Sequence, residues 1–179
     1  MRRADLLHVV HAAATVSGET EIVVVGSQSI LGAVAEPPES MLVSMEADVF
    51  PLHAPDKAED IDGALGDGSP FHSAYGYYAH GVGPETAKAP SGWDQRLVRV
   101  EVPQRAVSKV RAVALCLEPH DLVLAKLAAG RARDWDFARD AVAAGLVDPA
   151  VLRVRVHDLP VAPEILQAIV AGLAAMVGD

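Results

Sequence analysis

The chain has 179 residues, a length at which a single domain buries a sizeable core without disulfides. Apolar residues make up 51% of the sequence, which excludes an intrinsically disordered chain. The net charge of −9 argues against a protein that coats DNA nonspecifically, because such proteins carry a basic surface.

The charges are distributed unevenly along the chain. Residues 36–67 contain many acids and only Lys57 as a base, whereas bases outnumber acids in residues 96–139. An acidic segment that faces a basic one suits a cation-dependent site for a polyanion such as a nucleotide. Two ordinary solvated surfaces explain the charge pattern equally well.

The sequence shows no targeting or membrane segment. The first residues lack the apolar core of a signal peptide, and the longest apolar tract, residues 165–177, is too short to span a bilayer. The single cysteine, Cys116, stands in an apolar run and is expected to be a small buried side chain. We therefore expect a cytoplasmic protein with no membrane partner.

The first elements in chain order are a helix and a strand. Apolar residues recur at helical spacing in residues 4–16, which predicts an amphipathic helix, with His8 and His11 on the surface. The continuous β-branched run at residues 22–25 predicts a central strand covered on both faces. Gly26 ends that strand and Ser27 opens a short helix, so the turn presents backbone N–H groups as an anion site. The alternative is that Gly26 only turns the chain and Ser27 only caps the helix.

A second strand is predicted over residues 41–50. One face of it is wholly apolar and is expected to pack in the core, whereas Glu46 and Asp48 lie on the other face, roughly 6–7 Å apart. Two acids at this separation raise each other's pKa unless a cation neutralises them, and Mg²⁺ bound by carboxylates and substrate phosphates would do so. The alternative is a solvated strand end.

The middle of the chain predicts further strands. The alternation of Tyr75, Tyr77 and Tyr78 favours a half-buried strand over aromatic rings that stack on a base. Residues 97–102 and 112–117 predict two more strands, and Glu101 would be a third acid beside Glu46 and Asp48 if their strands were neighbours.

The C-terminal part predicts helices at residues 119–129, about 134–144 and 163–177. Lys126 and Arg131 are candidates to meet phosphate, and Asp134 is a candidate to orient a base or a hydroxyl. In the alternative interpretation Asp134 is a helix cap and Arg131 a surface base. The expected fold is α/β (α+β), a single domain over residues 1–179 with a short mixed sheet in a core of about 21–117 and C-terminal helices in about 118–179.

These segments resemble a known family. VVVGSQSIL, SMEADVF and LEPHDLVLAKLAAGRARDWDFARD are similar to the nucleotidyltransferase-like proteins of the DUF6036 type, relatives of the AbiEii toxin group in the polymerase-β-like superfamily. The resemblance covers about residues 21–146, and its most specific part is the Lys-Leu-x-x-x-Arg-x-x-Asp portion.

The resemblance implies a function. Gly26 and Ser27 would contact the phosphates of a nucleoside triphosphate, Glu46 and Asp48 would hold Mg²⁺, and RNA or protein would accept the nucleotide, with an antitoxin as a further partner. The chain departs from the superfamily, because Glu46 stands where an aspartate is favoured and no certain third acid is evident. We therefore keep two hypotheses, a Mg²⁺-dependent nucleotidyltransferase with Asp48, Lys126 and Asp134 as catalytic residues, and an inert scaffold that binds a partner.

Overall fold

The computed structural model describes residues 1–104 and 110–177. In this part of the chain five strands form one mixed sheet in the order β3-β2-β1-β5-β4. The strands are β1 (Glu21–Val25), β2 (Glu46–Pro51), β3 (Tyr78–Gly81), β4 (Val98–Glu101) and β5 (Val113–Cys116). β1 runs antiparallel to β2 and parallel to β5. The predicted fold class, a short mixed sheet flanked by helices, is confirmed.

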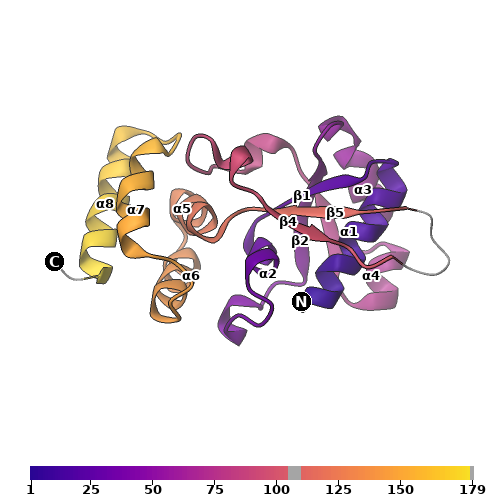
Figure 1. Ribbon diagram of the computed structural model, residues 1–179, viewed down its shortest axis with the longest axis horizontal. Helices are drawn as coiled ribbons and strands as arrows, with labels where there is room; N and C mark the ends of the chain where they lie inside the picture. Colours follow the sequence, from indigo (N-terminus) through magenta and orange to yellow (C-terminus); the bar gives the residue numbers. More distant parts are fainter. Residues whose placement is uncertain (105–109, 178–179) are drawn as a thin grey trace.

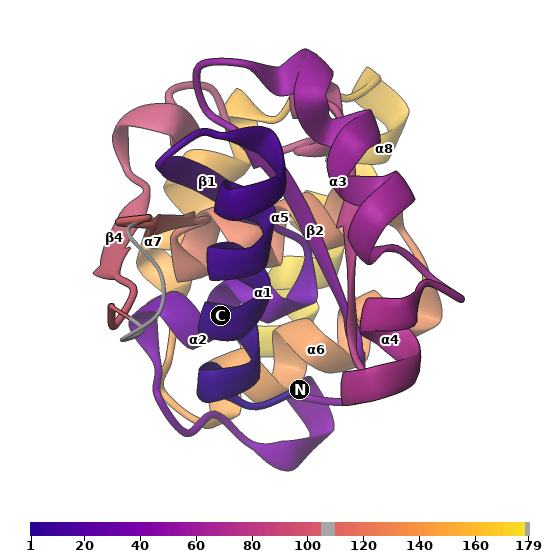
Figure 2. The same ribbon diagram turned by 90° about the vertical axis from the view of Figure 1, so that its right-hand side faces the viewer.

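Helices flank this sheet. They are α1 (Arg3–Ser17), α2 (Ile30–Ala33), α3 (Ala58–Leu65), α4 (Pro70–Tyr75), α5 (Pro119–Ala129), α6 (Ala132–Ala143), α7 (Pro149–Arg155) and α8 (Pro163–Val177). Figure 1 shows α1, α3 and α4 at one end of the molecule and α7 and α8 at the other. Seen from the first of these ends, α1 crosses in front of the sheet and α3 and α4 lie beside it (Figure 2).

The central strand β1 is buried on both faces, as its continuous apolar sequence predicted. Ile22 and Val24 belong to the main core with residues of α1, whereas Val23 and Val25 pack on the other face with Phe50 and the segment that follows β3. Because full burial of each such side chain contributes about 1.5–3 kcal/mol, the strand is fixed firmly. The turn at its end therefore has a rigid support.

The second strand is shorter than predicted. β2 begins at Glu46, and the residues before it leave the sheet, so that Val43 is 82% exposed and Met45 is 54% exposed. The expectation that both side chains pack in the core is wrong, although Ala47 and Val49 on the same face are buried. The reason is the length of β1: its register with β2 ends where Val25 meets Asp48, so earlier residues have no partner on that side.

The helical predictions are close to the structure. α5 and α8 have the predicted bounds, and α5 ends at Gly130, whose φ of +72° favours glycine. α8 packs on the molecule through Ile169 and Leu173, and Gly172 approaches Trp135 of α6 so closely that an added Cβ would collide with the indole ring. Among the helices that the structure describes, none is long and apolar enough to cross a membrane.

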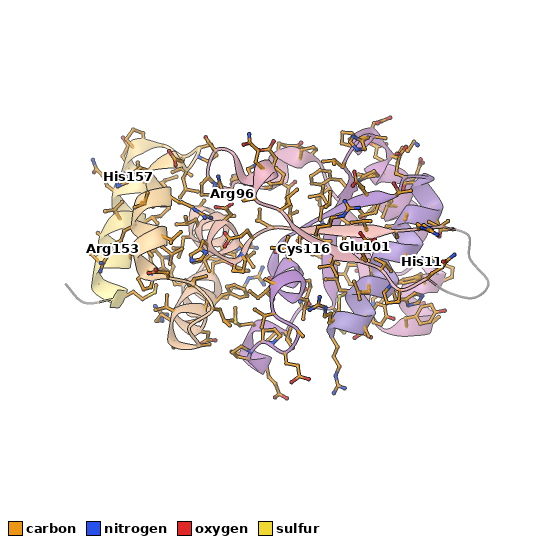
Figure 3. The ribbon with its side chains drawn as sticks, viewed as in Figure 1. His11, Arg96, Glu101, Cys116, Arg153 and His157 are labelled. Carbon is orange, nitrogen blue, oxygen red and sulfur yellow. The ribbon has the colours of Figure 1, made fainter. Side chains whose placement is uncertain are left out.

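The burial of three side chains can be compared with the prediction from sequence. The expectation that His8 and His11 lie on the surface is wrong, because His11 is 8% exposed and His8 Nδ1 lies 2.8 Å from the Tyr77 hydroxyl. Cys116 is fully buried in β5, as expected, and burial raises the pKa of its thiol to about 12. Figure 3 shows Cys116 near the middle of the molecule, away from Arg153 and His157 on the terminal helices.

Candidate active site

The two acids of β2 meet the side chains of β3 by strand register. Glu46 lies opposite Tyr78, and Asp48 lies opposite His80. Directly paired residues point to the same face of a sheet, so the four side chains form one group. His80 Nδ1 is 3.0 Å from Asp48 Oδ1 and 3.8 Å from Glu46 Oε1. The Tyr78 hydroxyl donates a hydrogen bond of 2.9 Å to Glu46 Oε2.

Glu46 and Asp48, which we call the strand-end acids, interact electrostatically. Burial raises the pKa of Asp48 and the neighbouring charge of Glu46 raises it further, while the hydrogen bond from His80 opposes both effects. The hydrogen bond to Glu46 raises the pKa of Tyr78 to about 12, so Tyr78 remains a donor at neutral pH. The strand-end acids therefore share a site in which one more positive charge would be favourable.

The turn after β1 is shaped around Asp48. Gly26 has a φ of +66°, and a Cβ at this position would collide with the Asp48 carboxylate. Only glycine satisfies both requirements. The 3₁₀ turn Ser27–Ser29 follows at once, and the Ser29 hydroxyl donates to the Gly26 carbonyl at 2.8 Å. Gly26, which ends β1, thus also leaves the space that the Asp48 carboxylate occupies.

Two bases belong to the C-terminal helices. Lys126 of α5 and Arg131, at the start of α6, share the carboxylate of Asp134: Lys126 Nζ lies 3.3 Å from Oδ1 and Arg131 Nε lies 2.9 Å from Oδ2. The Lys126 ammonium also lies 4.5 Å from the centre of the Phe137 ring. Burial lowers the pKa of Lys126, although the charge of Asp134 and its hydrogen bond oppose that shift. Asp134 itself is 0% exposed.

These elements enclose one cleft of about 600 Å³. Gly26, Ser27, Glu46 and Asp48 line it together with Lys126 and Arg131, and the α6 acids Asp136 and Asp140 also belong to its lining. The geometric requirement of the sequence prediction, that the turn and the acids open onto a common space, is therefore met. A cleft of this size holds a drug-sized or nucleotide-sized molecule.

The comparisons with known proteins agree with this geometry. Residues 4–166 match a family described as "Nucleotidyltransferase of unknown function (DUF6036)". The chain belongs to this family. No curated protein matches the sequence, and no solved structure matches it. For a DUF6036 nucleotidyltransferase-family protein, the cleft between β2 and α5 is the candidate active site.

Two expected residues of this DUF6036 protein lie elsewhere. Asp134 does not line the cleft; its carboxylate is wholly buried beneath Lys126 and Arg131 and accepts from the Arg131 backbone N–H at 3.3 Å, so it positions these bases and caps α6. Glu101 is not a third acid, because β5 and β1 separate β4 from β2, and its side chain is 73% exposed. Figure 3 places it on the sheet.

The residue that sequence reasoning missed is His80. It joins Glu46 and Asp48 in a group whose ligand atoms lie within 4.8 Å of one another. A signal was present: His80 and Tyr78 are two apart, as are Asp48 and Glu46, so pairing of the two segments would align them. Within the described residues this is also the group of acids and histidines that fits a metal ion, through two carboxylates and one imidazole.

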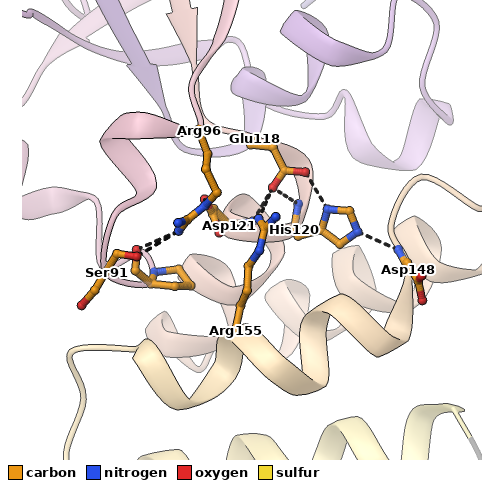
Figure 4. A network of polar contacts seen from close by, with 8 residues as sticks. Ser91, Arg96, Glu118, His120, Asp121, Asp148 and Arg155 are labelled. Carbon is orange, nitrogen blue, oxygen red and sulfur yellow. Dashed lines mark hydrogen bonds and ion pairs between the residues drawn. The ribbon is translucent and has the colours of Figure 1, made fainter.

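A second group of carboxylates in the DUF6036 protein has a different environment. Glu118 and Asp121, which we call the arginine-paired acids, begin α5 (Figure 4). Asp121 is 0% exposed and binds Arg96 Nε at 2.7 Å and Arg155 Nη1 at 3.1 Å. Glu118 accepts from Arg155 Nη1 at 2.7 Å and lies 2.6 Å from His120 Nδ1. This network joins α5 to α7 and to the segment before β4, and it is structural.

Proposed function

We propose that the protein is a Mg²⁺-dependent nucleotidyltransferase that moves a nucleoside monophosphate from a nucleoside triphosphate to an RNA or protein acceptor. The observation that carries the proposal is that the Gly26-Ser27 turn and the strand-end acids line the same cleft as Lys126 and Arg131. Membership of the family supports the transferase class. The substrate, the cation and the acceptor belong to the proposal.

In this proposal, each group of residues in the cleft has a separate role in nucleotide transfer. Gly26 and Ser27 position the phosphate chain at the end of β1, and Lys126 and Arg131 balance the charge on the transferred and leaving phosphates. Glu46 and Asp48 would hold the cation, which would supply neutralisation of the negative charge of the substrate. The acceptor hydroxyl forms a bond to the α-phosphorus, the bond to the β-phosphate oxygen breaks, pyrophosphate leaves with the electron pair, and the hydroxyl proton passes to solvent.

The biological setting is part of the same proposal. The relation to the AbiEii toxin group and an antitoxin partner rest on the sequence resemblance. A cytoplasmic location rests on the single cysteine, which suits a reducing compartment. Identifying the labelled acceptor tests the toxin-like role: a toxin-like enzyme transfers label to RNA or protein of the host, and a paired antitoxin suppresses that transfer.

The test uses Asp48→Asn, because its side chain lines the cleft without contributing to the core. We expect the variant to lose binding of Mg²⁺ and nucleoside triphosphate in calorimetry and to lose transfer of α-³²P label to RNA or protein extract. Glu101→Gln, an acid on the opposite edge of the sheet, is the matched control and should keep both activities. Unchanged nucleotide affinity in the Asp48 variant would remove the assignment of the cation site.

The second candidate is a nucleotidyltransferase scaffold without catalysis, which binds a partner. The observation that favours it is that the third member of the strand-end group is His80 and not a carboxylate. Absence of label transfer by the wild-type protein over all four nucleoside triphosphates, together with intact nucleotide binding, would support it. Transfer that is lost with Asp48→Asn would exclude it.

A further inference from the structure

The histidine in the strand-end group carries the inference. The sequence prediction gave the cation two carboxylates, whereas the structure adds a third donor, His80 Nδ1, within 4.8 Å of an oxygen of each of them. Its side chain is 49% exposed, so it is not needed to fill the core. Its position comes from backbone pairing of β2 and β3 and does not depend on a flexible loop.

We infer that Glu46, Asp48 and His80 form a mixed oxygen and nitrogen site that binds a first-row transition dication, such as Mn²⁺ or Zn²⁺, in preference to Mg²⁺. The inference deepens the proposed function, because it assigns the ion that the protein binds by itself at the same carboxylates before a nucleotide arrives. Mg²⁺ takes oxygen ligands almost exclusively, whereas imidazole is a good ligand for the transition dications.

The distances from His80 Nδ1 to the two carboxylates agree with a single ion. Two atoms that each lie about 2.0–2.2 Å from one ion are at most about 4.4 Å apart. The separations from His80 Nδ1 to Asp48 Oδ1, 3.0 Å, and to Glu46 Oε1, 3.8 Å, both fall below this limit.

The surroundings support the same donor set. The Tyr78 hydroxyl holds Glu46 Oε2, which leaves Oε1 as the oxygen nearer the imidazole. Gly26 leaves space for the Asp48 carboxylate at the end of β1, because a Cβ at this position would collide with Oδ2. Such fixed outer contacts orient metal ligands and increase their affinity.

The experiment measures cation binding by the protein alone. Free aqueous Mn²⁺ gives an electron paramagnetic resonance signal that falls when the ion binds, and Mg²⁺ or Zn²⁺ is then added as competitor. We expect wild-type protein to bind Mn²⁺, Zn²⁺ to displace it readily, and Mg²⁺ to displace it only at about hundredfold or greater excess. Equal affinities for Mn²⁺ and Mg²⁺ would overturn the inference.

Variants separate the imidazole from the carboxylates. His80→Ala should weaken Mn²⁺ binding by about tenfold or more, since even loss of an outer partner of a metal ligand costs about 10–100-fold. His80→Asp, which restores an all-oxygen set, should shift the preference toward Mg²⁺. His53→Asn is the matched histidine control, because His53 lies beside Glu21 at the other end of β1, and it should leave the preference unchanged.

The outcomes also distinguish this inference from the proposed function. Selective Mn²⁺ binding that depends on His80, with no nucleotide transfer under any cation, would support the site and reject the transferase. Nucleotide transfer that depends on Asp48, with a cation preference that His80→Ala leaves unchanged, would support the transferase and reject the role of His80.

Discussion

The strand-end acids and the arginine-paired acids are both partly buried pairs of carboxylates. Arginine side chains of the protein neutralise the negative charge of the arginine-paired acids but not that of the strand-end acids. Arg96 and Arg155 bind Asp121, and Arg155 and His120 bind Glu118. Among the described residues, the partners of Asp48 and Glu46 are the imidazole of His80 and the neutral hydroxyl of Tyr78. The negative charge of a buried acid is neutralised when guanidinium groups of the protein pair with it. A pair of acids without such partners keeps its negative charge and can bind a cation from solution. The difference separates a structural cluster from a binding cluster.

The largest effect is expected when the structural cluster loses its charge. Asp121→Asn leaves the guanidinium groups of Arg96 and Arg155 without a compensating carboxylate. Breaking a buried pair costs about 3–5 kcal/mol, and we expect about 3 kcal/mol of unfolding free energy here because both arginines retain some solvent contact. Urea unfolding measures the loss. A loss below about 1 kcal/mol would show that the network does not hold α5 to α7.

The same substitution in the binding cluster should have a different signature. Asp48→Asn removes a carboxylate whose pKa is raised by burial and by Glu46, so the unfolding free energy without cation should not fall. A cation at 100 times its Kd stabilises the folded wild type by about 2.7 kcal/mol, and the variant should lose this stabilisation. Thermal unfolding with and without Mn²⁺ measures both quantities. If Asp48→Asn lowered the unfolding free energy in the absence of cation, the strand-end acids would contribute to stability as the arginine-paired acids do, and the distinction between the two clusters would be wrong.

The pH dependence of stability gives a further test of the arginine-paired acids, through Glu118. Burial alone would raise the pKa of Glu118, but the hydrogen bond and charge of His120 and the charge of Arg155 lower it below 4.5 on balance. A lowered folded-state pKa contributes stability that is present above the unfolded pKa and is lost as the pH falls through the folded pKa. Glu118→Gln should therefore cost about 1–2 kcal/mol at pH 7, and the difference from wild type should shrink below pH 4.5.

That prediction is checked by unfolding both proteins between pH 7 and pH 3. A difference between wild type and Glu118→Gln that stays constant over this range would show that the charge of Glu118 contributes nothing.

The smallest effect is expected at the acid that sequence analysis offered as a third ligand. Glu101 lies on the edge strand β4, where its partner is Arg99 at 3.2 Å, and both side chains are largely exposed. Glu101→Gln should change the unfolding free energy by less than about 0.5 kcal/mol and leave cation affinity unchanged. Weakened Mn²⁺ binding in this variant would contradict the sheet order.

The parts of the fold that could be predicted are those with a local cause. The apolar run of β1 predicted a strand buried on both faces, and Pro119 with Gly130 marked the two ends of α5. The part that could not be predicted depends on long-range pairing. Gly26 marks the end of β1, but nothing in the sequence shows that Val25 pairs with Asp48, and therefore that the residues before Glu46 lack a neighbouring strand on that side.

The candidate site shows the same division. The strand-end acids, the turn and the two bases carry local signals, and the structure brings them into one cleft. Whether they hold a nucleotide and a cation stays a prediction. His80 entered the group only through the register of β3 on β2, and Glu101 was excluded by strand order, neither of which a single sequence specifies. The burial of Asp134 depends on how α6 packs against α5, which is again a tertiary property.

The close approach of Gly172 to Trp135 gives the molecule an intrinsic optical probe. The chain contains two tryptophans, so Trp93→Phe leaves Trp135 as the sole indole emitter. Because the glycine of α8 lies against its ring, undocking of the last helix would admit water and shift the fluorescence to longer wavelength. The attachment of the C-terminal helix can thus be followed in real time, without a label and independently of any ligand in the cleft.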